Sequence, residues 1–252
     1  MSETATYPSL ADRTVLVTGG ASGIGAAIVD AFIGQGSRVG FLDMDTDGAN
    51  AQLAKHEGMP IAFAPCDLRD IAALQSAIAD IRDRLGPITI LVNNAARDDR
   101  HTLESVTSEY WDERFATNLK HQFFAAQAVA GDMRAAGKGA IVNMGSVSWV
   151  IGQGGMPCYT TAKSAVQGLT RSLARDLGPD NIRVNTILPG WIMTQRQIEN
   201  WLTPEGEQEL MTRQCLKRKL VPDDIARPTL FFASDEAGAC TNQSYIVDGG
   251  WV

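Results

Sequence analysis

The stretch that decides the fold reads RTVLVTGGASGIG and spans residues 13–25. Residues 13–18 are rich in β-branched side chains and predict a short buried strand. The glycines that follow lead into a helical apolar pattern that ends near Gly34 and Gly36. A strand, a glycine-rich turn and a helix form a phosphate cradle, because the free N–H groups of the helix face the anion. We predict cofactor contacts here, with a ligand-free glycine turn as the alternative; the residues are Gly19, Ser22, Gly23, Ile24 and Gly25.

Strands and helices alternate along the rest of the chain. Further strands are predicted at 38–42, 60–66, 88–92, 140–145, 182–188 and 244–247. Helices are predicted at 70–85, at 108–137 with a break around Asn118, at 157–177 and from residue 222. This alternation predicts an α/β fold: a single domain over residues 1–252 with one doubly wound, Rossmann-type parallel sheet and helices on both faces. Residues 191–216 have no clear sheet role and predict a substrate lid, with a surface insertion as the alternative.

Composition excludes several classes of function. The formal net charge is -7 and no dense Lys/Arg run occurs, so nucleic acid is not an expected partner. No apolar run reaches membrane-spanning length, and residues 1–12 lack the pattern of a secretory signal. The four cysteines form no Cys-x-x-Cys pair, so we expect reduced thiols and no metal site; they are Cys66, Cys158, Cys215 and Cys240. Together these features predict a cytoplasmic protein.

An acidic residue ends the second predicted strand. Asp43 follows the glycine turn by about 20 residues, where a carboxylate accepts hydrogen bonds from both ribose hydroxyls of an adenosine. A 2′-phosphate there would meet like charge, so Asp43 predicts NAD rather than NADP as the cofactor. The alternative is that Asp43 merely forms a turn at the strand end.

Polar residues follow the predicted strand at 88–92. Asn93, Asn94 and Ala95 come first, and the charged pair Arg97 and Asp98 follows. Ligands bind beyond the carboxyl ends of strands in open α/β sheets, so we expect this segment beside the cofactor, with a plain turn as the alternative.

A hydroxyl, a phenol and an ammonium group occur within residues 146–163. Tyr159 and Lys163 are four residues apart and share one face of a helix, and Ser146 ends the preceding strand. Free tyrosine titrates near ~10, and a neighbouring ammonium favours the phenolate. The pattern predicts that Tyr159 takes a proton from an alcohol, that Lys163 lowers the Tyr159 pKa and that Ser146 orients the substrate oxygen.

Taken together, these motifs resemble the short-chain dehydrogenase/reductase family over roughly residues 12–251. The cofactor turn, Asn93-Asn94-Ala95 and the Ser146–Tyr159–Lys163 spacing carry the resemblance. The resemblance implies that Asn118 holds a water of a proton relay. It also implies further cofactor contacts at Asp67, Leu68, Asn93, Asn94, Ala95, Tyr159, Lys163, Pro189, Ile192 and Thr194. One departure is Ala96, where the family usually has glycine.

A narrower resemblance links several segments to the bacterial D-xylose 1-dehydrogenase group. The segments lie at 98–101, 110–114, 203–207 and 214–217, partly in the expected substrate loops. Tryptophans offer flat apolar faces for a sugar, and polar side chains offer hydrogen bonds. The candidate substrate residues are Arg97, Asp98, Ser146, Trp149, Gln153, Trp191 and Trp201.

The resulting hypothesis is an NAD-dependent dehydrogenase that oxidises the anomeric carbon of an aldose to a lactone. D-xylose-like pentoses, L-arabinose, D-galactose and L-fucose are the candidate substrates. One alternative is oxidation at another carbon of a sugar acid, deoxy-sugar acid or polyol, and another is an NAD-binding regulator without turnover. The family resemblance implies a homotetramer, and a face of small residues on the Tyr159 helix would pack most simply against another copy; it includes Ala162, Ala165, Val166, Leu169 and Leu173.

Overall fold

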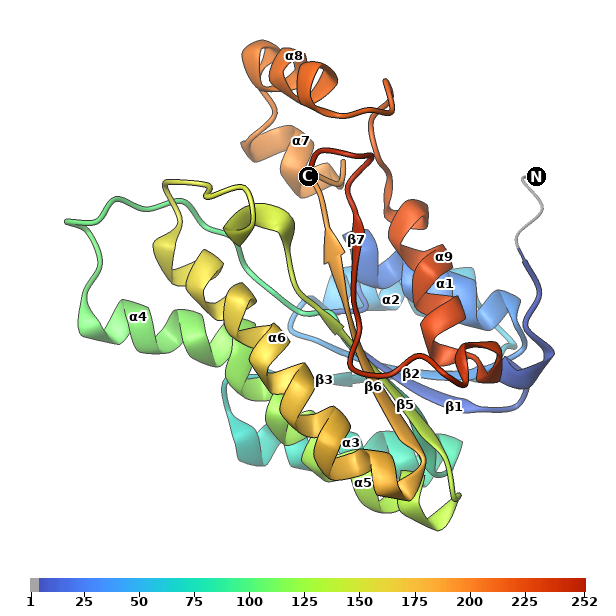
Figure 1. The fold of residues 1–252 in the computed structure, drawn as a ribbon. Helices are drawn as coiled ribbons and strands as arrows, with labels where there is room; N and C mark the ends of the chain where they lie inside the picture. The colour runs from blue at the N-terminus through green and yellow to red at the C-terminus, as the bar shows by residue number, and fades with distance from the viewer. Residues whose placement is uncertain (1–4) are drawn as a thin grey trace.

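Seven parallel strands form one sheet in this computed structural model, which describes residues 5–252 (Figure 1). Residues 1–4, part of the predicted domain and of the segment searched for a secretory signal, lie outside the described residues. The strand order is β3-β2-β1-β4-β5-β6-β7. The strands are β1 (Thr14–Thr18), β2 (Arg38–Asp43), β3 (Ile61–Pro65), β4 (Ile88–Asn93), β5 (Gly139–Met144), β6 (Ile182–Pro189) and β7 (Ser244–Val247). All neighbours pair in parallel, as the alternating sequence pattern predicts.

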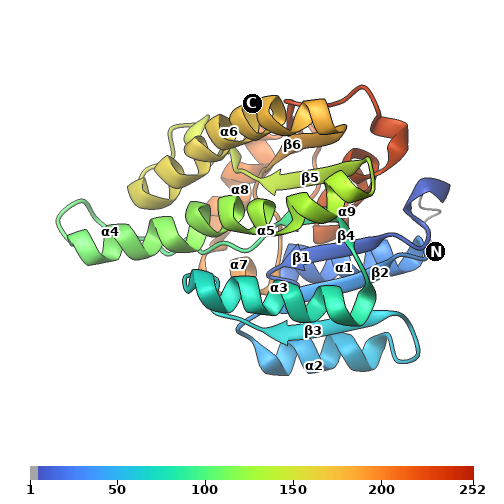
Figure 2. The same cartoon turned by 90° about the horizontal axis from the view of Figure 1, so that it is seen from below.

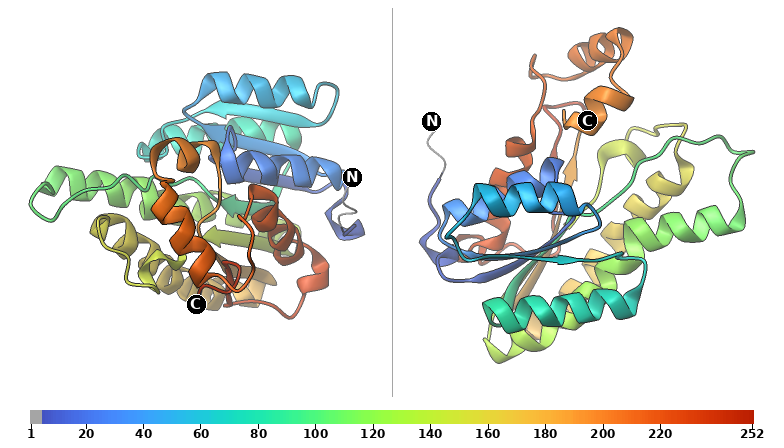
Figure 3. Two further views of the ribbon diagram at one scale, coloured as in Figure 1. Left: turned by 90° about the horizontal axis from the view of Figure 1, so that it is seen from above. Right: turned by 180° about the vertical axis from the view of Figure 1, so that it is seen from behind.

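Helices cover both faces of the sheet (Figures 2 and 3). One face carries α1 (Gly23–Gly34), α2 (Thr46–Lys55) and α9 (Pro222–Ala233). The other carries α3 (Ile71–Leu85), α5 (His121–Ala135) and α6 (Pro157–Leu177), with α4 (Ser108–Phe115) extending α5. Two short helices, α7 (Gln195–Asn200) and α8 (Pro204–Arg213), stand above the carboxyl ends of the strands.

The strands divide their side chains between two apolar cores. Val15 and Val17 of β1 pack into one core with α1 and α9, whereas Leu16 between them packs into the other with α3 and α5. Successive residues of a strand point to opposite faces, so a strand buried on both faces reads as a continuous apolar run. This explains why the short runs in the sequence predict the strands so well.

The helical segment around Asn118 is split, as predicted. Ala116–Lys120 forms one turn of π-helix between α4 and α5, and Asn118 lies at its centre with no exposed surface. Such turns insert an extra residue into a helix and re-aim its side chains. Here the π turn directs Asn118 toward the loop that follows β4.

Three expectations from the sequence are wrong. Helix α2 was not predicted, because Asp45 and Asp47 indicate a turn; Asp45 instead caps the helix by accepting from the Gly48 amide. Residues 191–215 were expected to be irregular, yet they hold α7 and α8.

The third concerns the face of α6 that was expected to pack against another copy. Ala162 and Val166 of this face are fully buried within their own chain, and Leu173 joins its second core. Of the helices in residues 5–252, none is both long and apolar enough to cross a membrane.

Candidate active site

A cleft of about 1030 Å³ opens at the carboxyl ends of the strands. It runs from the glycine turn after β1, past the ends of β4 and β5, to α7 and α8. Within the sheet, β2 and β3 lie on one side of β1, whereas β4 and the strands after it lie on the other side. Ligands of doubly wound sheets bind where the strand order reverses in this way. The volume is at the upper end of the range for small-molecule sites, enough for a dinucleotide beside a substrate.

The glycine turn is tight enough to exclude side chains. Gly19 has a φ of +70°, and a Cβ there would lie 2.9 Å from the Ala95 Cα. A Cβ on Gly25 would lie 1.7 Å from the Gly19 carbonyl oxygen. Ser22, Gly23 and the first turn of α1 therefore line an open cradle whose backbone amides can face an anion.

A carboxylate lies at the adenosine end of this cradle. Asp43 ends β2, and its Oδ2 accepts from the Ala21 amide at 2.9 Å. Asp67 and Leu68 line the same end of the cleft, as the resemblance implies. Asp67 is paired with Arg69, however, which also bonds to Glu113. The Arg69 guanidinium at this end is thus already paired with two carboxylates. Asp43 accepts one backbone amide on each oxygen and keeps further acceptor sites for a ligand.

The loop after β4 is held against the glycine turn. Asn94 donates from Nδ2 to the carbonyls of Thr18 and Gly19, at 3.1 and 3.0 Å. The Thr18 hydroxyl accepts from the amides of Asn94 and Ala95. Asn94 and Ala95 line the cleft, but Asn93 does not. Asn93 is fully buried and donates to Asn143 Oδ1 at 2.8 Å, so the expected cofactor contact of its side chain is replaced by a bond inside the sheet.

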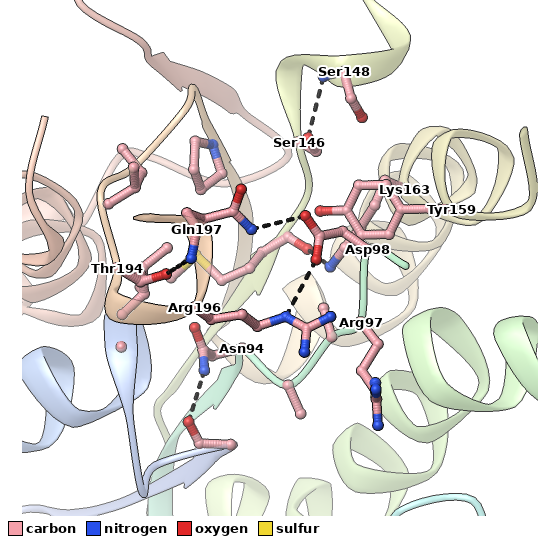
Figure 4. Close-up of a pocket in the computed structure, with 18 of the residues that line it drawn as sticks. Asn94, Arg97, Asp98, Ser146, Ser148, Tyr159, Lys163, Thr194, Arg196 and Gln197 are labelled. Carbon is pink, nitrogen blue, oxygen red and sulfur yellow. Dashed lines mark hydrogen bonds and ion pairs between the residues drawn. The ribbon is translucent and has the colours of Figure 1, made fainter. Parts of the chain in front are cut away.

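Ser146, Tyr159 and Lys163 meet at the floor of the cleft (Figure 4). Ser146 lies just beyond β5, and its Oγ accepts from the Ser148 amide at 3.1 Å. Tyr159 is half-buried. Lys163 is almost completely buried, and its Nζ donates to the Met144 carbonyl at 2.7 Å. The Lys163 ammonium lies 5.8 Å from the centroid of the Tyr159 ring. The structure thus brings together the three groups that the sequence spacing links, and Ser148 lines the same cleft.

The electrostatics of this group differ from the sequence expectation. Burial raises the pKa of Tyr159 well above its usual value, and the Asp98 carboxylate raises it further. Ser146 and Arg100 oppose this rise. Burial also lowers the pKa of Lys163 to about 7, because an ammonium is poorly solvated there. The sequence predicts that Lys163 lowers the Tyr159 pKa, but Lys163 is not among the groups that shift this pKa in the protein without cofactor.

Asn118 acts on the loop rather than on the cleft. Its Oδ1 accepts from the Arg97 amide at 2.9 Å, and its Nδ2 donates to the Arg114 carbonyl at 2.9 Å. The side chain is fully buried and does not line the cleft. The water-holding role that the resemblance implies stays a prediction, and the amide group itself is engaged with the protein.

Charged and aromatic side chains line the far end of the cleft. Gln153, Trp191 and Trp201 line it as expected, but Trp149, in the turn Val147–Trp149 after β5, does not. One face of Trp201 is also covered, since the Arg100 guanidinium lies 5.0 Å from the centre of the ring. Trp191 is also engaged, because its Nε1 donates to Gln197 Oε1 at 2.9 Å and its ring lies against Gly206.

The two charged candidates in the loop after β4 differ in direction. Arg97 points away from Tyr159 and pairs with Asp99 at 3.2 Å (Figure 4). Asp98 points into the cleft, where its Oδ2 accepts from Gln197 Nε2 at 2.8 Å.

The chain matches a family model described as enoyl-(acyl carrier protein) reductase over residues 19–252. The chain belongs to the short-chain dehydrogenase/reductase family. It is 51% identical to a probable galactose dehydrogenase, GalD, of Rhizobium meliloti over 97% of this chain and 96% of the relative. It is 47% identical to a D-xylose 1-dehydrogenase of Caulobacter vibrioides over 98% of each chain. A solved structure of a short-chain alcohol dehydrogenase from Sinorhizobium meliloti, itself assigned only provisionally, superposes with a TM-score of 0.91 at 31% identity, covering 97% and 98% of the two chains.

The named relatives are dehydrogenases, and this chain is an oxidoreductase that acts on CH–OH groups with a nicotinamide cofactor. The cleft suits that cofactor. Gly23 has a φ of +56°, and a Cβ there would lie 3.2 Å from Thr194 Cγ2, so both the backbone and the neighbouring side chain disfavour any residue but glycine at this point of the cradle. Pro189, Ile192 and Thr194 line the cleft after β6, near Tyr159 and Lys163.

The departure from the family pattern at Ala96 is accommodated locally. The non-glycine residues with positive φ among residues 5–252 are Asp12, Asn181 and Asn242, so Ala96 has an ordinary backbone. The preceding carbonyl, that of Ala95, accepts from His121 Nε2 at 3.2 Å.

Several lining residues were not predicted from the sequence. Arg100 lay in a segment that suited a solvated loop equally well, and Arg196 and Gln197 lay in a segment expected to be irregular. A signal for the neighbouring α8 did exist, because Thr203-Pro204-Glu205 has the pattern of a helix start. The unpredicted lining residues at the far end of the cleft include Arg100, Ile151, Met156, Arg196, Gln197 and Trp251.

Proposed function

We propose that this enzyme is an NAD-dependent sugar dehydrogenase that oxidises the anomeric carbon of an aldose to the lactone. The observation that carries the proposal is the joint placement of Ser146, Tyr159 and Lys163 in a cleft whose other end carries Asp43. The similarity to proteins named galactose dehydrogenase and D-xylose 1-dehydrogenase supports a sugar as the substrate.

The roles follow from the chemistry of each group. Tyr159 takes the proton of the reacting hydroxyl, and Ser146 holds that hydroxyl against the phenol. NAD supplies the hydride acceptor when it is bound. Lys163 would hold the nicotinamide ribose of bound NAD from its buried position, and a protonated Lys163 in the loaded enzyme would stabilise negative charge that develops on Tyr159. The anomeric C–H and O–H bonds break and a C=O bond forms, so the products are a lactone, NADH and a proton.

NAD is favoured over NADP by the charges at the adenosine end. Asp43 can accept from ribose hydroxyls, and Asp45 lies beside it in the lining. A 2′-phosphate would meet both carboxylates. Arg69, which lines the same end, is engaged with Asp67 and Glu113.

The test is an NADH-formation screen over pentoses, hexoses, deoxy sugars and sugar acids, with each cofactor in turn. D-xylose, L-arabinose, D-galactose and L-fucose are the first candidates. Product analysis then separates the carbons, because only anomeric oxidation gives a lactone. A ketose product would move the assignment to another carbon, and tight NAD binding without turnover of any alcohol would point to a regulator.

The proposal includes a cytoplasmic homotetramer, on the basis of the family resemblance. All four cysteines are free thiols, which suits a reducing compartment. The edge strand β7 exposes Tyr245 and Ile246, an apolar strip that another subunit would cover. Light scattering after size-exclusion chromatography tests the assembly, and a monomeric mass would contradict it.

A further inference from the structure

The Asp98 carboxylate disfavours ionisation of Tyr159, the proposed catalytic base. It lies near both Tyr159 and Lys163, and its negative charge favours the neutral phenol of Tyr159. Figure 4 shows its carboxylate directed toward the Tyr159 hydroxyl from the loop after β4. A nearby anion makes proton abstraction by Tyr159 harder. The position of Asp98 suits contact with the substrate better than activation of Tyr159.

The Asp98 carboxylate is held in position by neighbouring side chains, but not all of its hydrogen-bond acceptor sites are occupied. Only 17% of its side chain is exposed. Its Oδ2 accepts from Gln197 Nε2 at 2.8 Å, and its Oδ1 lies 3.6 Å from Arg196 Nε, beyond hydrogen-bond length. Two carboxylate oxygens offer about four acceptor sites, so acceptor capacity remains on the cleft side.

A substrate bound for reaction must place its hydroxyl on Tyr159 and Ser146. Asp98 also lines the cleft and is directed toward the Tyr159 hydroxyl, so the carbon next to the reacting one is the part of the substrate that it would face. An ionised carboxylate accepts hydrogen bonds but donates none, so it recognises an O–H group and repels another carboxylate.

We propose that Asp98 is a specificity-determining residue that accepts a hydrogen bond from the hydroxyl on the carbon next to the reacting one. The inference rests on the proposed function, because it takes Tyr159 as the group that marks the reacting carbon. It assigns the substrate class as neutral vicinal diols, which includes aldoses with a free 2-hydroxyl. It excludes analogues with a carboxylate on that neighbouring carbon.

The first arm of the test compares an aldose with its 2-deoxy analogue in wild-type enzyme and in Asp98→Asn. A hydrogen bond to a charged group corresponds to about 10- to 100-fold in kcat/KM. We expect the wild-type enzyme to prefer the 2-hydroxy sugar by that factor. The preference should shrink by about tenfold in Asp98→Asn and vanish in Asp98→Ala.

The second arm uses pH. The charges around Tyr159 and Asp98 come from the β4 loop (Arg100), from α6 (Lys163) and from α7 (Arg196). Removing the Asp98 charge lowers the apparent pKa of the base, so the pH profile of kcat/KM should move to lower pH in Asp98→Asn. A residue too far from Tyr159 to reach the reacting end of the substrate would leave this profile unchanged, and the comparison with the 2-deoxy sugar then tests the hydrogen bond itself.

Asp99→Asn is the matched control. Asp99 pairs with Arg114 and Arg196 at 2.6 Å each, so its loss disturbs the same loop and lid. It does not line the cleft. We expect Asp99→Asn to keep both the preference for the 2-hydroxy sugar and the pH profile, and thermal melting checks that each variant folds.

The outcomes separate the two proposals. The comparison runs on the best polyhydroxylated substrate from the screen, whether aldose or not. Turnover of a polyol but of no aldose would overturn the proposed function. The role of Asp98 would then be tested by comparing that polyol with its deoxy analogue in the same variants. The Asp98 proposal is overturned if Asp98→Asn keeps the wild-type preference, or if the best substrates lack a hydroxyl beside the reacting carbon.

Discussion

The two ends of the cleft are built in different ways. The cofactor end is made of backbone: Gly19 and Gly25 set the turn, and Asn94 ties it to the next strand with two hydrogen bonds to carbonyls. The substrate end is made of charged side chains, in which Asp98 and Asp99 meet Arg196 of α7. One end is fixed by close backbone contacts and by amide hydrogen bonds to backbone carbonyls, and the other by ion pairs between side chains of distant segments.

This difference indicates which part of the cleft can change its substrate preference by substitution. A backbone cradle accepts the phosphates of any dinucleotide, because amide groups carry no side-chain identity. A wall of side chains on loops can change with single substitutions while the sheet stays the same. We therefore expect changes at the cofactor end to affect all substrates alike, and changes at the substrate end to affect one sugar more than another.

The largest effect should come from the group between the two ends. Tyr159→Phe removes the proton acceptor, and general base catalysis is worth about 10²- to 10⁴-fold. We expect NADH formation to fall by at least about 10³-fold for every sugar, while NAD binding measured by calorimetry stays near wild type. Tyr110→Phe is the control, because the Tyr110 hydroxyl bonds to His101 and does not line the cleft. Retained turnover in Tyr159→Phe would remove the basis of the assignment.

A change at the cofactor end tests whether its effect is uniform across sugars. Asp43→Ser loses a charged acceptor for the ribose, which corresponds to about 10- to 100-fold in NAD affinity. The preference for NAD over NADP should fall by a similar factor, with equal losses for all sugars. Asp47→Asn on the first turn of α2 is the control, since Asp47 does not line the cleft. A loss that differed strongly between sugars would break the division between the two ends.

The buried ammonium between the ends should lower stability at neutral pH. An unfolded lysine titrates near ~10.4, whereas burial brings the pKa of Lys163 to about 7. The unfolded chain thus binds more protons between these values, so this group makes stability rise with pH across that window. Lys163→Met should be inactive yet melt about 2–4 °C higher at pH 7, as for a gain of about 1 kcal/mol.

The pH dependence of the melting temperature of Lys163→Met tests the direction of this effect. The gap in melting temperature between Lys163→Met and wild type should narrow at pH 9, because wild-type Lys163 costs less there. Lys138→Met is the control: Lys138 pairs with Asp235 at the surface and should show no such pH dependence. A gap that widened with pH would contradict the burial argument.

The smallest effect should come from α7. Gln197 donates to Asp98 and accepts from Trp191 Nε1 at 2.9 Å, so it joins α7 to the substrate wall. Gln197→Ala should raise KM for the sugar by about 2- to 10-fold, as for one hydrogen bond, with KM for NAD unchanged. Glu199→Ala on the same helix is the control, because Glu199 is exposed and does not line the cleft. Equal changes in both KM values would mean that α7 serves the whole cleft.

Local patterns in the sequence were enough to predict the sheet, the glycine turn and the Ser146–Tyr159–Lys163 group. A strand buried on both faces is a run of apolar residues, and Tyr159 and Lys163 share a helix face by their spacing alone. Asp43 at the end of β2 follows from the same local reading, and its preference for NAD stays a prediction.

Only the tertiary structure decided the rest. Asn93 turned inward to Asn143, and Trp149 lies outside the cleft, because each depends on neighbours from another strand or turn. Arg196 meets Asp99 across 97 residues of chain, and Gln197 meets Asp98 across 99. No local pattern encodes such a pair, since either partner alone is an ordinary surface charge or amide. The sequence by itself therefore determined what chemistry this protein performs on a hydroxyl group, and the folded chain decided which side chains surround that hydroxyl, because they meet only after distant segments have packed.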